Sequence, residues 1–279
     1  MTAEALDFRG RSVLAVFAHP DDESLACGGL LAWCAALGAR VSVCCATAGE
    51  AGPAAGAEGG VAFGRASLGG IRLRELQDAA DVLGVTDLVV LDYEDAMLPW
   101  TDAEPLEADI RSTIRRLRPD VVVTFGDDGL YGHPDHIAIH ERTTAAVAAL
   151  GAEAPLLYYD TMPRGRMRAL VSHVTSTLAR DGRDLPAPLR VLGIDEPDAF
   201  GALAPSPTLV VETGRFAVTK LAAIKCHGTQ LEHDALGWLA PCDAPRLLGT
   251  EQFHRADVGA DGGGFIERLA AAGPGPGAS

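Results

Sequence analysis

The sequence has little positive charge and no long uninterrupted apolar segment. Its 23 lysines and arginines are outnumbered by 38 aspartates and glutamates, which gives a formal net charge of -15. Because binding to a phosphate backbone needs basic patches, this balance argues against a nucleic-acid partner. No stretch approaches the roughly 20 uncharged apolar residues of a membrane span, and the N-terminus lacks the basic and apolar regions of a secretory signal. We therefore expect a soluble, cytoplasmic protein with neither a nucleic-acid nor a membrane partner.

Paired cysteines are also missing. The chain has six cysteines, but no two of them form a CxxC pair, and Cys44 and Cys45 are adjacent in an expected strand. We interpret all six as free thiols that act as small core hydrophobes, which fits a cytoplasmic location.

Apolar runs alternate with helical patterns through the first 160 residues. Strands are expected at residues 12–18, 40–47, 87–92, 120–126 and 156–160, and helices at 25–37, 72–84, 103–117 and 136–150. Continuous Val, Ile and Leu runs between helices indicate parallel strands that are buried on both faces. The sequence therefore predicts an α/β fold: a Rossmann-like, doubly wound, mostly parallel sheet with helices on both faces.

The alternation weakens after residue 160. Residues 161–207 mix short apolar pieces with Arg, Gly and Pro, so we expect an excursion on the substrate side. A strand at 208–213 and a helix at 216–226 then rejoin the core. We predict one domain over residues 1–258, followed by a Gly/Pro/Ala-rich tail at 259–279 that is partly disordered.

The first strand-to-helix turn lacks the G-x-G-x-x-G pattern of a dinucleotide site and reads AHPDDES instead. Acidic side chains at a helix start would repel a pyrophosphate, so a cation is the more favourable ligand. Helix capping alone would explain Asp22 or Glu23. It gives no reason for His19 at the carboxyl end of a strand, where ligands bind in open α/β sheets.

A second polar cluster, YGHPDH, follows the fourth strand and contains His133 and His136. One alternative is that Asp135 in this cluster caps a helix and has no other role. In the common strand order 3-2-1-4-5, however, strands one and four are neighbours, and their carboxyl ends share one crevice. Two histidines and an aspartate from separate strand ends can form a zinc site with an open position, which is the catalytic form.

Five motifs together resemble the PIG-L/LmbE-like de-N-acetylases: AHPDDE, TAGE, RLRE, YGHPDH and KLAAIKCHGTQ. The resemblance implies zinc-dependent hydrolysis of an N-acetyl or other N-acyl group, with one Zn²⁺ per chain or another divalent metal such as Fe²⁺. By motif position it implies His19, Asp22 and His136 as metal ligands and Asp21 as the general base. A protonated His133 and the Tyr131 hydroxyl would stabilise the transition state.

The resemblance extends to supporting positions whose roles stay open. Arg72 and Asp95 match substrate-binding positions, although they could be a solvated helix arginine and a turn former. Glu50 and His227 resemble further substrate-site residues. Asp135 is either an orienter of a metal-ligating imidazole or a cap, and Glu23 either supports the site or only starts the helix.

The expected substrate is a small, soluble N-acyl amino-sugar glycoside. The tyrosine before glycine in YGHPDH resembles the actinobacterial mycothiol-pathway members of the family, so an amidase of mycothiol-type conjugates is an alternative. A non-catalytic sugar- or metal-binding relative is another. Antibiotic or thiol biosynthesis would fit the activity, and homo-oligomers are common in this family. Residues 49–70 and 161–207 are expected to set the selectivity.

Overall fold

The computed structural model describes residues 6–52, 64–183 and 188–272, which form one seven-stranded sheet in the order β3-β2-β1-β4-β5-β7-β6. The first five strands pair in parallel, whereas β7 runs antiparallel to β5 and β6. The predicted order of these five strands is confirmed. The strands are β1 (Ser12–Phe17), β2 (Arg40–Thr47), β3 (Asp87–Tyr93), β4 (Val121–Phe125), β5 (Leu156–Thr161), β6 (Leu209–Glu212) and β7 (Thr250–Gly259).

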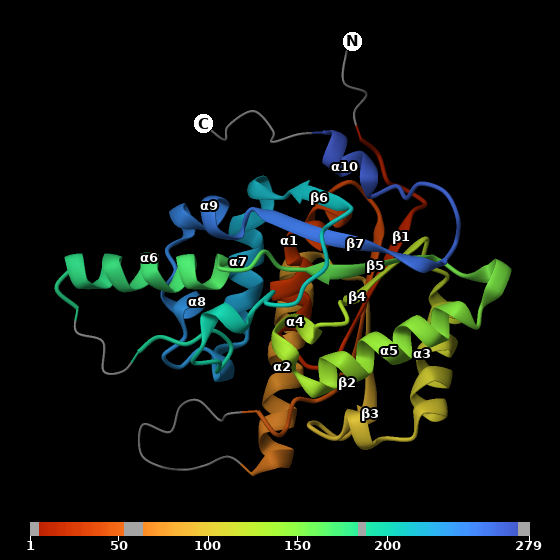
Figure 1. Ribbon diagram of the computed structural model, residues 1–279, viewed down its shortest axis with the longest axis horizontal. Helices are drawn as coiled ribbons and strands as arrows, with labels where there is room; N and C mark the ends of the chain where they lie inside the picture. The colour runs from red at the N-terminus through yellow and green to blue at the C-terminus, as the bar shows by residue number, and fades with distance from the viewer. Residues whose placement is uncertain (1–5, 53–63, 184–187, 273–279) are drawn as a thin grey trace.

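Helices cover both faces of the sheet, as predicted. Helices α1 (Asp22–Ala36), α2 (Arg65–Leu83) and α7 (Ala217–Cys226) pack together on one face, and α3 (Ala103–Leu117) and α5 (Pro134–Ala148) on the other (Figure 1). The remaining helices are α4 (Gly129–Gly132), α6 (Arg166–Arg180), α8 (Ala235–Trp238), α9 (Ala244–Leu248) and α10 (Glu267–Ala271).

The central strands bring the two polar motifs together. Every residue of β1 and β4 is buried, and Leu14 pairs with Val122 in a parallel register. Such Val- and Leu-rich strands are stable only with both faces covered, which fixes them at the centre of the sheet. Because β1 and β4 are parallel neighbours, AHPDDES and YGHPDH leave the same sheet edge.

Strand β7 was not predicted. Its sequence, TEQFHRADVG, contains many polar residues, because it is an antiparallel strand with only part of its side chains buried. The predicted boundary at residue 258 falls inside this strand. Beyond it, Ile266 and Leu269 are fully buried in the core, and residues 273–279 lie outside the described part of the chain.

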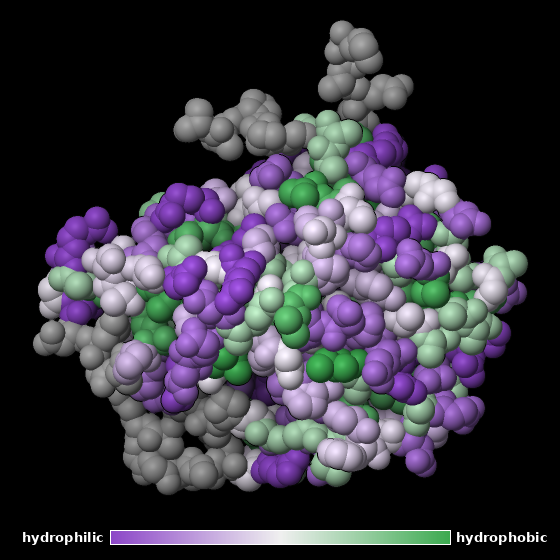
Figure 2. Space-filling view, viewed as in Figure 1, coloured by the Kyte–Doolittle hydropathy of each residue, from purple (hydrophilic) through white to green (hydrophobic). Residues whose placement is uncertain are grey.

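The surface in Figure 2 is mostly hydrophilic, with single hydrophobic residues scattered over it. None of the helices in the described ranges is long and apolar enough to cross a bilayer. Four of the six cysteines are buried free thiols, as predicted. Cys226 is only half-buried and Cys242 is exposed, so the core assignment was wrong for Cys242, which lies in a surface turn at Pro241–Asp243.

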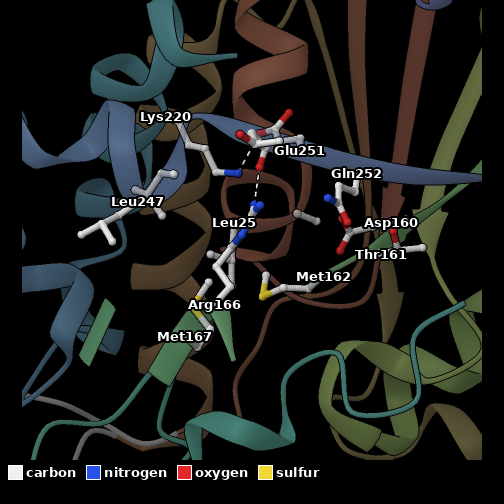
Figure 3. Close-up of a pocket in the computed structure, with 13 residues that line it drawn as sticks. Leu25, Asp160, Thr161, Met162, Arg166, Met167, Lys220, Leu247, Glu251 and Gln252 are labelled. Atoms are coloured by element: carbon white, nitrogen blue, oxygen red, sulfur yellow. Dashed lines mark hydrogen bonds and ion pairs between the residues drawn. The ribbon is translucent and has the colours of Figure 1, made fainter. Parts of the chain in front are cut away.

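Helix α1 is interrupted directly after its first turn. Cys27 has φ -143° and ψ 19°, outside the helical region. The helix restarts against Glu251 of β7, whose carboxylate oxygens accept the backbone N–H groups of Gly29 at 2.8 Å and Leu30 at 2.7 Å. Lys220 of α7 donates to the same carboxylate at 2.6 Å (Figure 3). A buried ion pair therefore caps the second part of α1 and fixes where its acidic first turn lies.

A small cavity of about 20 Å³ lies beside this ion pair (Figure 3). It has room for about one water molecule. Asp160 lines it, with one carboxylate oxygen that has no hydrogen-bond partner, while Lys220 pairs with Glu251 and Arg166 donates to the Thr250 carbonyl. Burial raises the pKa of Asp160 well above its usual value. Asp160 therefore holds its proton more tightly in the folded protein than in the unfolded chain.

We expect Asp160→Asn to stabilise the protein increasingly as the pH rises. A carboxyl whose pKa is raised on folding binds its proton more tightly in the folded state, so its contribution to stability is lost as the pH climbs towards the folded pKa. Asparagine is neutral at every pH. Melting temperatures measured between pH 5 and pH 9 should diverge in favour of the variant, whereas the exposed Asp195→Asn should follow the native protein. A difference in melting temperature between Asp160→Asn and the native protein that is constant or shrinks as the pH rises would contradict this account.

Candidate metal centre and active site

A pocket of about 260 Å³ opens where β1 and β4 end. Loops after β1, β2, β3 and β4 contribute to its wall, together with residues of α2, of a segment between α6 and β6, and of the turn after α7. Seven predicted site residues line it: His19, Asp21, Asp22, Arg72, Asp95, Tyr131 and His133. His136, Asp135, Glu23, Glu50 and His227 do not line the pocket but contact residues that do.

Three candidate ligand groups lie close together at the pocket. Nδ1 of His19 lies 3.2 Å from Nε2 of His136, and the Asp22 carboxylate lies beside both rings, with Oδ2 3.5 Å from the His19 nitrogen and Oδ1 3.3 Å from the His136 nitrogen. Zinc bonds of about 2.0 to 2.1 Å in tetrahedral geometry put neighbouring ligand atoms about 3.3 Å apart. The spacing therefore fits one small metal ion bound by the two histidines and Asp22.

The hydrogen bonds of the two rings leave Nδ1 of His19 and Nε2 of His136 facing each other, where either a proton or a metal ion can lie between them. Nδ1 of His136 lies 3.2 Å from the Gly129 carbonyl oxygen, so it donates and leaves Nε2 unprotonated. Burial lowers the pKa of His136 to about 3, which keeps this ring neutral. Nε2 of His19 faces the carboxylates of Asp95 at 3.0 Å and Asp135 at 3.2 Å, so it donates and leaves Nδ1 for a metal. Carboxylates that orient an imidazole in this way are typical of zinc sites.

The floor of the pocket attracts positive charge. Burial alone would lower the pKa of His19, but hydrogen bonds with Asp135, Asp22 and Asp95 raise it well above its usual value. Burial likewise raises the pKa of Asp22, yet the neighbouring His136 and His19 hold it below its usual range. A proton or a metal ion can supply the missing charge, so metal binding should weaken at low pH.

Two other groups of three in the described chain have ligand atoms close together, namely His19 with His133 and His136, and His19 with Asp95 and Asp135. In the first, Nδ1 of His133 accepts the Asp135 backbone N–H at 3.2 Å. In the second, the two carboxylates share Nε2 of His19. Both groups are thus explained by hydrogen bonds that support the site, and Asp135 contacts a ligand as well as lying in the first turn of α5.

Asp21 lies between these ligands and the pocket opening. Its backbone has φ 111°, an uncommon conformation for a residue other than glycine. Arg72, itself buried, donates to the Asp21 carboxylate at 3.1 Å and to the carbonyls of Pro20 at 2.6 Å and Gly49 at 2.7 Å. Burial raises the pKa of Asp21 to about 6, against the opposing effect of Arg72. Arg72 therefore positions Asp21, whatever contact it also makes with substrate.

Glu23 and His227 form a buried pair behind Asp21. Nε2 of His227 lies 3.1 Å from Oε1 of Glu23, and Oε2 of Glu23 accepts the Asp21 backbone N–H at 3.1 Å. Both side chains are 1% exposed. Glu23 thus holds the strained Asp21 backbone as well as starting α1. The predicted substrate contact of His227 stays a prediction, because the described contact of its Nε2 is with Glu23.

Glu50 supports the loop after β3. Its Oε1 accepts the Asp95 backbone N–H at 2.9 Å, and Asp95 in turn accepts the Ala51 backbone N–H at 2.7 Å. One Asp95 oxygen also faces Nε2 of His19, so Asp95 joins the pocket wall to the metal ligands. A direct substrate contact of Glu50 or Asp95 remains a prediction.

His133 and Tyr131 lie beside the metal ligands. Ring centres of His133 lie 4.9 Å from His19 and 4.5 Å from His136, and the Tyr131 ring lies 5.2 Å from His136. Burial and the nearby His19 lower the pKa of His133. This favours a neutral ring with its proton on Nε2, whereas the family resemblance implied a protonated His133.

Part of the pocket wall was predicted only as segments and not as residues. Leu192, Gly193 and Ile194 line the pocket and lie in the expected substrate-side segment 161–207, and Ala51 and Gly52 lie in the segment 49–70. Ala96 and Gln230 also line the pocket, and the KLAAIKCHGTQ motif, which ends at Gln230, could have identified the latter. The apolar residues carry no chemical signal of their own, so the sequence could not single them out within these segments.

Comparison with known proteins agrees with this geometry. Residues 14–147 match the family described as PIG-L: GlcNAc-PI de-N-acetylase. A 1D-myo-inositol 2-acetamido-2-deoxy-alpha-D-glucopyranoside deacetylase from Rhodococcus jostii is 34% identical over 79% of this chain and 82% of its own length.

Solved structures share the fold at lower identity. The 4-carboxy-2-hydroxymuconate hydratase from Pseudomonas putida superposes with a TM-score of 0.63 and 18% identity over 91% of this chain and 99% of its own. The N,N'-diacetylchitobiose deacetylase from Pyrococcus horikoshii superposes with a TM-score of 0.58 and 22% identity, over 88% of this chain and 84% of its own. Since a hydratase and a deacetylase both match, these likenesses show the fold and leave the activity to the site.

Proposed function

The chain belongs to the PIG-L family of de-N-acetylases, and from this membership we propose that it is a zinc-dependent hydrolase that removes an N-acetyl group from a small amino-sugar glycoside. The observation that carries the proposal is that one nitrogen of His19, one nitrogen of His136 and the Asp22 carboxylate lie 3.2 to 3.5 Å from one another, with Asp21 next in the chain to Asp22. Similarity to an inositol-linked glucosaminide deacetylase favours an N-acetylglucosaminide as substrate.

His19, Asp22 and His136 would hold the metal, because the two ring nitrogens and the Asp22 carboxylate lie within 3.5 Å of one another. When bound there, zinc would lower the pKa of a water molecule and polarise an acyl carbonyl. Zinc is favoured over Fe²⁺ as the native metal, since two imidazoles and one carboxylate with an open position are typical of catalytic zinc.

Asp21 would act as the general base. It faces the pocket beside the three ligands, and burial brings its pKa to about 6, where a carboxylate accepts a proton readily and returns it to the leaving amine. Arg72 and Glu23 keep its carboxylate and its backbone in place.

His133 and Tyr131 would stabilise the charge that develops on the former carbonyl oxygen. His133 offers an Nε2–H donor because its Nδ1 accepts a backbone N–H. Tyr131 offers a neutral hydroxyl donor, since burial raises its pKa further above the usual value. Donors held rigidly in a pocket are effective at this task. Cytoplasmic location and a homo-oligomeric state stay predictions from the sequence.

Asp22→Asn is expected to abolish both zinc binding and deacetylation. A neutral amide is a poor zinc ligand, and Asp22 is one of three donors. The zinc content of the purified protein, measured by plasma emission spectrometry, should fall from about one zinc per chain to nearly none. Acetate release from N-acetylglucosaminides should fall with it. The exposed Asp78→Asn serves as the control and should keep both. Full zinc content in Asp22→Asn would remove Asp22 from the ligand set, and a native protein that holds zinc but releases no acetate would favour the non-catalytic alternative.

A further inference from the structure

A tight turn between α6 and β6, Val191–Ile194, lies against the active-site pocket. Val191 and Ile194 exchange two backbone hydrogen bonds, at 3.2 and 2.9 Å. Leu192, Gly193 and Ile194 form part of the pocket wall. Leu192 and Ile194 are thus apolar residues in the lining of a pocket that also contains charged and aromatic residues, and both also pack against the hydrophobic core.

Leu192 has an unfavourable backbone conformation. Its φ is 47°, in the left-handed region that glycine and asparagine accept and that a bulky side chain such as leucine rarely adopts. Residues kept in such conformations cluster at functional sites, where the surrounding structure imposes them. A conformation that disfavours leucine calls for a reason why leucine is present.

The surrounding structure does impose this conformation. Asp234, with 0% of its surface exposed, accepts the Leu192 backbone N–H with Oδ2 and the Leu236 backbone N–H with Oδ1 at 2.8 Å. On the other side of the turn, Arg190 bonds through its backbone to His233 at 3.0 Å and to Ala235 at 2.8 Å. The turn is thus tied to the start of α8 and cannot relax without breaking buried hydrogen bonds.

We propose that Leu192 is a specificity-determining residue that selects N-acetylglucosaminides with an alkyl or aryl aglycone. The inference rests on the proposed function. When the N-acetyl group is at the metal site, an apolar aglycone would move out of water and into contact with Leu192 and Ile194, which is favourable. A polyol aglycone such as inositol would place hydroxyl groups against the same apolar wall, where they find no partner from these side chains.

Steady-state kinetics on three substrates test this assignment: 4-nitrophenyl N-acetylglucosaminide in both anomers, the inositol N-acetylglucosaminide, and free N-acetylglucosamine, which has no aglycone. We expect the native protein to favour the aryl glycoside. Leu192→Asn and Leu192→Gly should lower kcat/KM for it by roughly tenfold or more, mainly through KM, and lower kcat/KM for free N-acetylglucosamine much less. The control is Leu203→Asn, at a leucine that is 83% exposed and outside the pocket wall.

Asparagine and glycine both accept a positive φ, which offsets the packing that is lost with the Leu192 side chain, so both variants should still fold. Equal losses on all three substrates, or no loss on the aryl glycoside, would overturn the role of Leu192 while the proposed function stands. A zinc-loaded native protein that releases no acetate from any of the three would overturn the proposed function, and the role of Leu192 with it.

Discussion

Asp21→Asn is expected to lower kcat for deacetylation by a factor of roughly 10² to 10⁴, the usual contribution of a positioned general base. The amide cannot accept a proton from water. Asparagine accepts a positive φ at least as well as aspartate, so the backbone at φ 111° should not change. Its amide oxygen can still accept from Arg72. The loss should therefore be chemical, with the fold intact.

Zinc content distinguishes the proposed role of Asp21 as general base from the role of Asp22 as metal ligand. Asp21→Asn should keep about one zinc per chain, whereas Asp22→Asn should lose it. The measurement pairs acetate release under saturating substrate with metal analysis of the same preparation. Retention of more than a tenth of the native kcat would exclude Asp21 as the base, and loss of zinc would instead make it a ligand.

Glu251→Gln is expected to destabilise the protein by about 3 to 5 kcal/mol, the typical effect of removing one partner of a buried ion pair. Lys220 is 4% and Glu251 3% exposed, so the lysine would remain buried without its counter-ion. The glutamine can offer only one oxygen, so the Gly29 or the Leu30 N–H would face an amide nitrogen. Urea unfolding of the zinc-loaded protein, with matched m-values, measures the change.

Two comparisons show whether the ion pair is the cause. Lys220→Met in the Glu251→Gln background should recover part of the lost stability, because no unpaired charge then remains. Asp195→Asn removes an ion pair with Arg190 in which both side chains are more than half exposed, and it should have a much smaller effect. A similar loss for the exposed and the buried pair would show that Glu251 does not stabilise α1 through its charge.

Much of the fold follows from local pattern. The parallel strands are continuous Val-rich runs between helices, a signal that needs no knowledge of distant contacts, and their ends are within a few residues of those expected. Strand β7 escaped prediction because its pairing with β5 and β6 is long-range and its side chains are only partly buried. Helix α2 begins at Arg65, ahead of the expected residue 72, because its Gly- and Ser-containing start has a weak helical signal.

The site divides in the same way. The amino-acid sequence alone was enough to show which groups are present: which strand ends carry His19, Asp21, Asp22, His133 and His136, and hence that the site suits a cation better than a nucleotide. Only the tertiary structure decided how these groups are held, because Arg72, Glu251 and Leu192 act through contacts between residues far apart in the chain. Residue type and short spacing specify which groups can react, whereas their distances, their protonation and the pocket wall depend on packing that no local pattern contains.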